Sequence, residues 1–125
     1  MKSVVNTDKA PAAIGPYSQA IKAGSFMFIS GQIPVDPTTG TVVSGGVAEQ
    51  TKQALDNLTA ILRSENLGLE NVVKTTVFLI DLNDFQTVNQ VYGEYFSQDA
   101  PARCCVQIAR LPKDVSVEIE AIAYL

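Results

Sequence analysis

Two stretches of the chain carry apolar residues at the spacing of an amphipathic helix. The first covers residues 47 to about 65 and is followed by Asn66 and Gly68, residue types that commonly end helices. The second starts near Asn83, where Gln86 three residues later resembles the partner of a capping box. The pattern therefore predicts two helices, with apolar positions Val47, Thr51, Leu55, Leu58 and Leu62 in the first and Phe85, Val88, Tyr92 and Phe96 in the second.

Shorter runs of apolar, β-branched and aromatic residues predict the strands. Residues 26–29 are continuously apolar, which indicates a strand buried on both faces. Residues 36–40 then supply an Asp, a Pro and a Gly in the order typical of a turn. The predicted strands lie around Val4 and at residues 17–23, 26–29, 72–80, 102–109 and 116–124, in the order ββαβαββ or close to it.

These elements leave one face of the predicted sheet uncovered. Two helices can pack on one face, but the chain has no third helix for the other. Several strands are nonetheless apolar on both faces. We therefore expect a single α+β domain over residues 1–125, whose second sheet face is covered by other copies of the chain in a closed homo-oligomer.

Composition narrows the classes of function. The chain has 125 residues, of which 46% are hydrophobic and 18% charged, as expected for one globular domain. Its net charge of −4 and pI near 4.6 would repel nucleic acid, so no nucleic-acid partner is expected. The sequence contains no histidine, which excludes Ser-His-Asp and Cys-His nucleophiles and histidine-bound metals.

Cysteine usage and hydropathy indicate a cytoplasmic protein. Cys104 and Cys105 are adjacent, and neighbouring side chains on a strand point to opposite faces, so the two are poor disulfide partners. A chain without disulfides fits a reducing compartment. Because the sequence shows neither a signal peptide nor an apolar run of about 18 residues, we expect no membrane association.

The last two predicted strands carry the side chains best suited to chemistry. Strand alternation places Arg103 and Cys105 on one face, and it gives Glu118 and Glu120 a common face in the final strand. An arginine, a cysteine and a glutamate could thus gather on one side of the sheet. Arginine can grip a carboxylate with two parallel hydrogen bonds, and a glutamate can orient or activate water.

Each of these residues also has a simpler explanation. A strand Arg opposite a strand Glu more often forms a cross-strand salt bridge, and an isolated cysteine such as Cys105 more often packs as a small apolar residue. Asn89 falls on the apolar face of the second helix, where a structural hydrogen bond to nearby backbone would satisfy its amide. Tyr17 and Ser30, taken alone, are ordinary strand residues.

Four groups of residues nevertheless resemble one known family along essentially the whole chain. The sequence resembles the reactive intermediate deaminase family, also called the RidA-like or YjgF family. The matching segments are residues 14–20 (IGPYSQA), 29–35 (ISGQIPV), 73–78 with 81–85 (VKTTVF, DLNDF), and 101–106, 109–114 and 118–121 (PARCCV, ARLPKD, EIEA).

This resemblance implies a chorismate-mutase-like α+β fold, with a mixed β-sheet, assembled as a homotrimer with pockets between subunits. It also implies a 2-iminobutanoate/2-iminopropanoate deaminase that works without a cofactor. Such an enzyme hydrolyses the enamines 2-aminoacrylate and 2-aminocrotonate, through their imine tautomers, to 2-keto acids and ammonia. Its small-molecule partners would then be 2-imino and 2-keto acids.

The resemblance also assigns roles to individual residues. Arg103 matches the arginine that holds the substrate carboxylate, and Glu118 matches the acidic residue that positions the attacking water. The remaining matches are pocket positions: Cys105, expected to contribute through its backbone, and Tyr17, Ser30, Gly31 and Asn89. Two features depart from the family pattern. Residues 96–101 form a shorter segment than in many relatives, and Cys104 replaces a common serine.

Two other functions stay open from the sequence. The same pocket could hold a small 2-keto acid as a regulatory signal, without meaningful turnover. Glu118 separates these alternatives, because a sensor of anions needs no carboxylate to position water. An endoribonuclease or translation inhibitor is the third alternative, and the acidic pI and absence of histidine argue against it.

Overall fold

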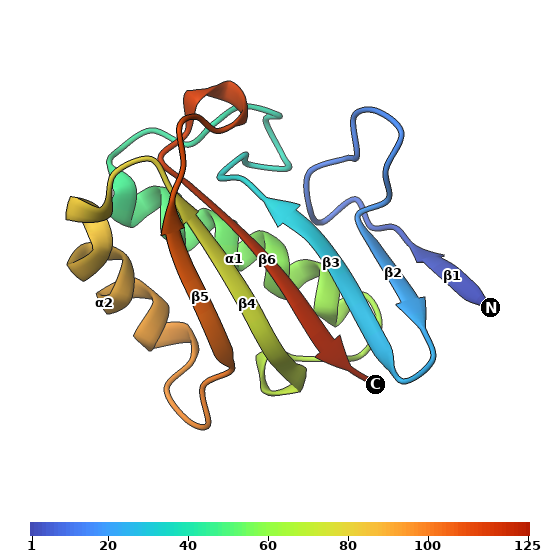
Figure 1. The fold of residues 1–125 in the computed structure, drawn as a ribbon. Helices are drawn as coiled ribbons and strands as arrows, with labels where there is room; N and C mark the ends of the chain where they lie inside the picture. Colours follow the sequence, from blue (N-terminus) through green and yellow to red (C-terminus); the bar gives the residue numbers. More distant parts are fainter.

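The computed structural model describes residues 1–125 as one six-stranded sheet with two helices (Figure 1). Neither helix is both long enough and apolar enough to cross a membrane. Short 3₁₀ turns at Leu69–Asn71, Leu82–Asp84 and Pro112–Asp114 link the main elements. These elements are β1 (Lys2–Val5), β2 (Ala20–Ala23), β3 (Phe26–Gln32), α1 (Val47–Arg63), β4 (Val72–Leu79), α2 (Phe85–Tyr95), β5 (Ala102–Gln107) and β6 (Val117–Tyr124).

The sheet has the strand order β1-β2-β3-β6-β4-β5 and is mixed. Only β4 and β5 run parallel, and α2 forms the crossover between them, as parallel neighbours require. All other neighbouring pairs are antiparallel. The last strand, β6, therefore lies near the middle of the sheet, whereas β5 is an edge strand beside α2 (Figure 1).

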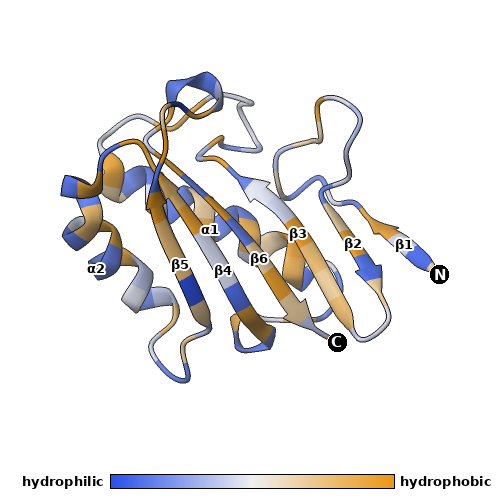
Figure 2. Cartoon of the chain, viewed as in Figure 1, coloured by the Kyte–Doolittle hydropathy of each residue, from blue (hydrophilic) through white to orange (hydrophobic).

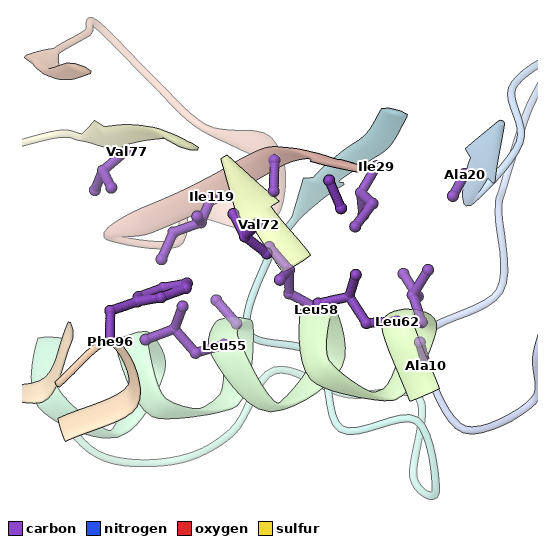
Figure 3. Packing of buried hydrophobic residues seen from close by; sticks show 14 of the residues in the cluster. Ala10, Ala20, Ile29, Leu55, Leu58, Leu62, Val72, Val77, Phe96 and Ile119 are labelled. Atoms are coloured by element: carbon purple, nitrogen blue, oxygen red, sulfur yellow. The ribbon is translucent and has the colours of Figure 1, made fainter. Parts of the chain in front are cut away.

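Both helices pack on the same face of the sheet. Leu55, Leu58 and Leu62 of α1 are fully buried and point toward the strands (Figure 3). They share one core with Val88 of α2 and with the helix-facing residues of the strands. In β6 the alternation is complete, with Val117, Ile119, Ala121 and Ala123 buried toward the helices. Burying side chains of this kind contributes roughly 1.5–3 kcal/mol for each large residue, so this layer holds the fold together.

The other side of the sheet, here termed the open face, is uncovered in a single chain. Phe26 and Phe28 of β3 are 44% and 46% exposed, and Tyr124 of β6 is 48% exposed. Val4 of β1 is 63% exposed, whereas its neighbour Val5 is buried toward the helices, so Val4 lies on the open face. Hydrophobic stretches run along β3 and β6 (Figure 2). Adjacent large apolar side chains of this kind mark an interaction surface rather than a solvated one.

The predicted helices and most strands are confirmed to within about two residues, but the element order is longer than ββαβαββ. Three strands precede α1, as the separate ranges around Val4 and at residues 17–23 and 26–29 predicted, so the written order is one strand short. Residues 17–23 form a strand only from Ala20, so Tyr17 lies in a loop. The strand at residues 26–29 continues to Gln32, and in one chain it is buried on a single face.

The capping box expected at Asn83 and Gln86 is wrong. Asn83 lies inside the 3₁₀ turn, and its backbone N–H donates to Oδ1 of Asp81 at 2.9 Å. An aspartate that accepts from the residue two positions later forms a local turn of its own, which competes with the later capping signal. The helix α2 then continues directly from this turn at Phe85.

A candidate active site in two halves

Arg103 lies on the helix-facing side of the edge strand β5, opposite Thr75 of β4. Its Nη1 donates to Oδ1 of Asn89 on α2 at 2.7 Å. The Cζ atom of the guanidinium lies over two rings of the same helix, 4.9 Å from the Tyr92 centroid and 5.5 Å from the Phe85 centroid. Cation–π contacts and one hydrogen bond thus fix the plane of the guanidinium.

The guanidinium has hydrogen-bonding capacity to spare. Arginine carries five N–H donors, and within this chain Arg103 uses only Nη1. It forms no ion pair, since the two salt bridges of the chain are Lys22–Glu65 and Arg110–Asp114. The alternative of a cross-strand salt bridge to a glutamate is therefore wrong. A half-buried arginine whose plane is fixed and whose charge is unpaired is suited to a carboxylate ligand.

The residues around Arg103 hold its platform in place. The hydroxyl groups of Tyr92 and Thr75 are 2.7 Å apart in a buried hydrogen bond, and burial raises the pKa of Tyr92. Asn89 is half-buried and bonds the Arg103 side chain instead of nearby backbone. The sequence predicted Tyr92 and Phe85 only as core positions. The signal for their second role was Arg103 in the next strand, because an aromatic helix face can bind a cation.

Cys105 lies on the same side of β5 as Arg103 and packs against the core. Burial raises the pKa of its thiol, and the positive charge of Arg103 opposes that effect. A thiol with a raised pKa is protonated at neutral pH and is a poor nucleophile. We refer to Arg103, Asn89, Cys105, Phe85 and Tyr92 together as the arginine half.

Glu118 lies on the opposite face of the sheet from Arg103. Its neighbours Val117 and Ile119 are fully buried toward the helices, so Glu118 and Glu120 project from the open face. The expectation that Arg103, Cys105 and Glu118 gather on one side is therefore wrong. Alternation fixes the faces within one strand but does not relate two strands to each other. The strand β4 lies between β5 and β6 and pairs Arg103 with Thr75 and Glu118 with Phe78. Thr75 and Phe78 are an odd number of residues apart, so their partners point to opposite faces.

A second group of candidate residues is connected to Glu118 through Gly31. Gly31 lies in direct contact with the Glu118 carboxylate. Ser30 precedes Gly31 in β3, and its hydroxyl donates to the Ser18 carbonyl at 2.6 Å. Tyr17, which is 53% exposed, lines a cavity of about 550 Å³ together with Gly31. We refer to Tyr17, Ser30, Gly31 and Glu118 as the glutamate half.

The glutamate half has a distinct electrostatic character. Burial raises the pKa of Glu118, and the nearby charge of Glu120 raises it further. A second cavity, of about 340 Å³, lies next to it on the open face and is lined by Ser30, Lys74 and Glu120 among others. Neither cavity includes a residue of the arginine half. No three acidic or cysteine side chains of the chain converge in a way that could hold a metal ion.

The chain is similar to known proteins along its whole length. A model of the family described as Endoribonuclease L-PSP matches residues 7–125. A RutC family protein of Pyrococcus horikoshii is 57% identical, over 99% of this chain and 98% of its own length. The human 2-iminobutanoate/2-iminopropanoate deaminase is 54% identical, over 98% of this chain and 90% of its own length. The crystal structure of E. coli TdcF with bound serine has a TM-score of 0.94 and 48% identity, covering 98% of both chains.

Proposed function

Because the chain belongs to the reactive intermediate deaminase family, we propose that it hydrolyses 2-iminopropanoate and 2-iminobutanoate to 2-keto acids and ammonia. The observation that carries this proposal is the unpaired, oriented guanidinium of Arg103. Its free N–H donors match the carboxylate that every 2-imino acid bears. The 54% identity to a human protein with this activity supports the same substrate class.

The two halves of the site are proposed to meet across a subunit interface. Within one chain they lie on opposite faces of the sheet, so one substrate cannot touch both. A neighbouring copy that covers the apolar open face could bring its edge strand β5 toward Glu118. Because the two contacting surfaces differ, the contact is head-to-tail, and such contacts form a closed ring when the rotation between copies divides a full turn. We propose that the ring is a homotrimer.

The reaction proposed for this composite site is a simple hydration followed by elimination. Arg103 would hold the substrate carboxylate, and Glu118 of the neighbouring copy would orient a water molecule and accept its proton. Water adds to the imine carbon to give a 2-amino-2-hydroxy acid, and the protonated amino group then leaves as ammonia. The products are one 2-keto acid and one ammonia for each imine and water consumed.

The raised pKa of Glu118 suits this role. A carboxylate with a raised pKa is a stronger base, and its acid form can return the proton to the departing nitrogen. Orientation of water and acid–base assistance together supply accelerations of roughly 10²–10⁴. An imine is already electrophilic, so the proposed mechanism requires neither a covalent intermediate nor a redox cofactor.

A regulatory binding module is the second candidate. The E. coli TdcF structure contains bound serine, so a relative can hold a small amino acid. In that case Arg103 would still bind the carboxylate, but Glu118 would be dispensable. The family description also names an endoribonuclease, which is the third candidate and predicts cleavage of RNA by the purified chain.

The direct test couples a threonine or serine dehydratase to the purified chain and follows 2-keto acid formation. We expect the wild type to accelerate release of the keto acid. In both Arg103→Ala and Glu118→Gln this acceleration should be smaller by a factor of about 10² or more. Retained acceleration in Arg103→Ala would place the site elsewhere. Keto-acid binding without acceleration in any variant would favour the regulatory module.

A further inference from the structure

Gly31 occupies a β-bulge at the point where β3 passes Glu120 of β6, and it also lies against the side chain of Glu118 on the same strand. Ile29 pairs with Ala121 and Gln32 pairs with Ile119, so two residues of β3, Ser30 and Gly31, stand opposite the single residue between those partners on β6. A bulge turns a side chain or backbone segment toward a direction that a regular strand would not give. Here it brings the Cα of Gly31 against the Glu118 carboxylate.

The glycine at this position matters for the space that it leaves beside Glu118 and not for its backbone conformation. Gly31 does not adopt the left-handed φ that favours glycine, unlike Gly15, Gly24, Gly40 and Gly45. A Cβ placed on Gly31 would lie 2.8 Å from Cδ and 3.1 Å from Cγ of Glu118, and closer still to Oε2. Any other residue would therefore overlap the carboxylate.

The backbone on the glycine side cannot retreat easily. The Ser30 N–H donates to the Gln19 carbonyl at 2.9 Å, and the Ser30 hydroxyl donates to the Ser18 carbonyl at 2.6 Å. Gln19 is 2% exposed, and its side-chain amide bonds Thr7 and Pro11, which anchors this segment. The flexible side chain of Glu118 is therefore the part that would move.

We propose that Gly31 is a positioning residue, whose missing side chain leaves the space that fixes the Glu118 carboxylate in its reactive place. This inference rests on the proposed role of Glu118 in hydrolysis. Gly31 itself then needs no contact with the reacting atoms. A methyl group at position 31 displaces the carboxylate, and a displacement of about 1 Å can cost roughly 10²-fold in rate.

The ionisable groups near Glu118 define the pH readout. Glu120 stands on the same strand, Lys74 of β4 lines the adjacent cavity with Glu120, and Lys113 and Tyr17 line the cavity that includes Gly31. Strand β3 contributes no ionisable side chain. Burial is the main cause of the raised pKa of Glu118, so a carboxylate moved out of its place toward solvent should have a lower pKa.

The test compares Gly31→Ala with Gly93→Ala in the dehydratase-coupled assay. Gly93 is a matched control, because it has no positive φ and a Cβ there would meet nothing within 4 Å. We expect Gly31→Ala to lower kcat about 10²-fold with KM changed less than about threefold, and Gly93→Ala to retain wild-type kinetics. In a Glu118→Gln background, Gly31→Ala should lower kcat no further, because the group on which it acts is already lost.

Two outcomes would overturn the proposal. One is an active wild type whose kcat is unchanged by Gly31→Ala; the other is a loss that multiplies with that of Glu118→Gln, which would mean that Gly31 acts on the substrate directly. An NMR titration of the Glu118 side-chain carboxyl keeps the test independent of turnover. Its pKa should fall in Gly31→Ala and stay constant in Gly93→Ala, even if the wild type hydrolyses no imine; an unchanged pKa would contradict the inference.

Discussion

Arg103 shows how neighbouring side chains can hold a charged group in one position. The hydrogen bond to Asn89 and the two aromatic rings hold its guanidinium in one plane, while most of its donors stay free. A free arginine side chain would lose considerable rotamer entropy on binding a carboxylate, of the order of 2 kcal/mol. The contacts already made in the folded chain reduce that cost.

Asn89→Ala tests this orientation. The substitution removes the only side-chain acceptor for Arg103 within the chain but leaves the charge and both rings. We expect kcat/KM for 2-iminobutanoate to fall about tenfold, equivalent to about 1.4 kcal/mol, which is typical of one hydrogen bond to a charged group. Gln90→Ala, at the exposed next position of the same helix, is the control and should keep the wild-type value. Equal losses in both variants would show that helix perturbation, and not orientation of Arg103, is responsible.

The carboxylate of Glu118 should lower stability at neutral pH. Its pKa is raised in the folded chain, so the folded state holds the proton more tightly than the unfolded state. The resulting stabilisation is present below the unfolded pKa and is lost as the pH rises through the folded pKa. Glu118→Gln is therefore expected to have a higher Tm than the wild type at pH 7, with the difference shrinking below about pH 4. Thermal unfolding across this pH range checks the sign, and a lower Tm for the variant at pH 7 would contradict it.

At the scale of elements, apolar spacing located both helices because their core faces are continuous. The helix α1 buries positions three and four residues apart along its length, including Leu55, Leu58 and Leu62. The start of α2 was misplaced because Asp81 and Asn83 both suit a helix start, and only the structure shows which side chain accepts the backbone N–H.

The faces of the strands were harder to predict than the strands themselves. Alternation correctly paired Arg103 with Cys105 and Glu118 with Glu120. It could not relate the two pairs, because that relation depends on strand order and register, and a shift of one residue exchanges the faces. The bulge at Gly31 is equally invisible in the sequence, since nothing in the apolar pattern marks the extra residue.

Asp81→Ala tests the local turn that starts α2. Its side chain accepts from the Asn83 N–H at 2.9 Å, and loss of such a cap typically costs about 1 kcal/mol. We expect this decrease in the free energy of unfolding, measured in urea at fixed protein concentration. Asp84→Ala is the matched control because Asp84 makes no side-chain cap bond, so its loss should be less than half as large. A larger loss of stability in Asp84→Ala than in Asp81→Ala would show that Asp84, and not Asp81, caps this turn.

At the scale of the whole molecule, the proposal of a site shared between copies depends on the open face, because one chain carries the two halves on opposite faces of its sheet. The exposed aromatic residues of the open face are too large and too closely grouped for a solvated sheet face. The arginine half lies at the opposite side of the sheet, by the edge strand β5 (Figure 1). Assembly and activity are therefore expected to be lost together.

Phe28→Glu tests this link. Phe28 is 46% exposed on the open face and belongs to neither half of the site. A charge at this position cannot be buried without a partner, so we expect a monomer by sedimentation and loss of imine hydrolysis, although no residue of either half is replaced. Gln86→Glu adds the same charge on the exposed side of α2 and should leave both properties unchanged. A Phe28→Glu variant that stays oligomeric and active would show that the open face is not the surface through which copies assemble.

Mixing two inactive variants tests the central claim most directly. Arg103→Ala retains the glutamate half, and Glu118→Gln retains the arginine half. If each site joins the arginine half of one copy to the glutamate half of the next, equal co-expression restores both halves in about one quarter of the sites. We predict recovery of about one quarter of the wild-type rate of 2-keto acid formation. No recovery in verified mixed oligomers would contradict a site shared between copies and place the chemistry within one chain.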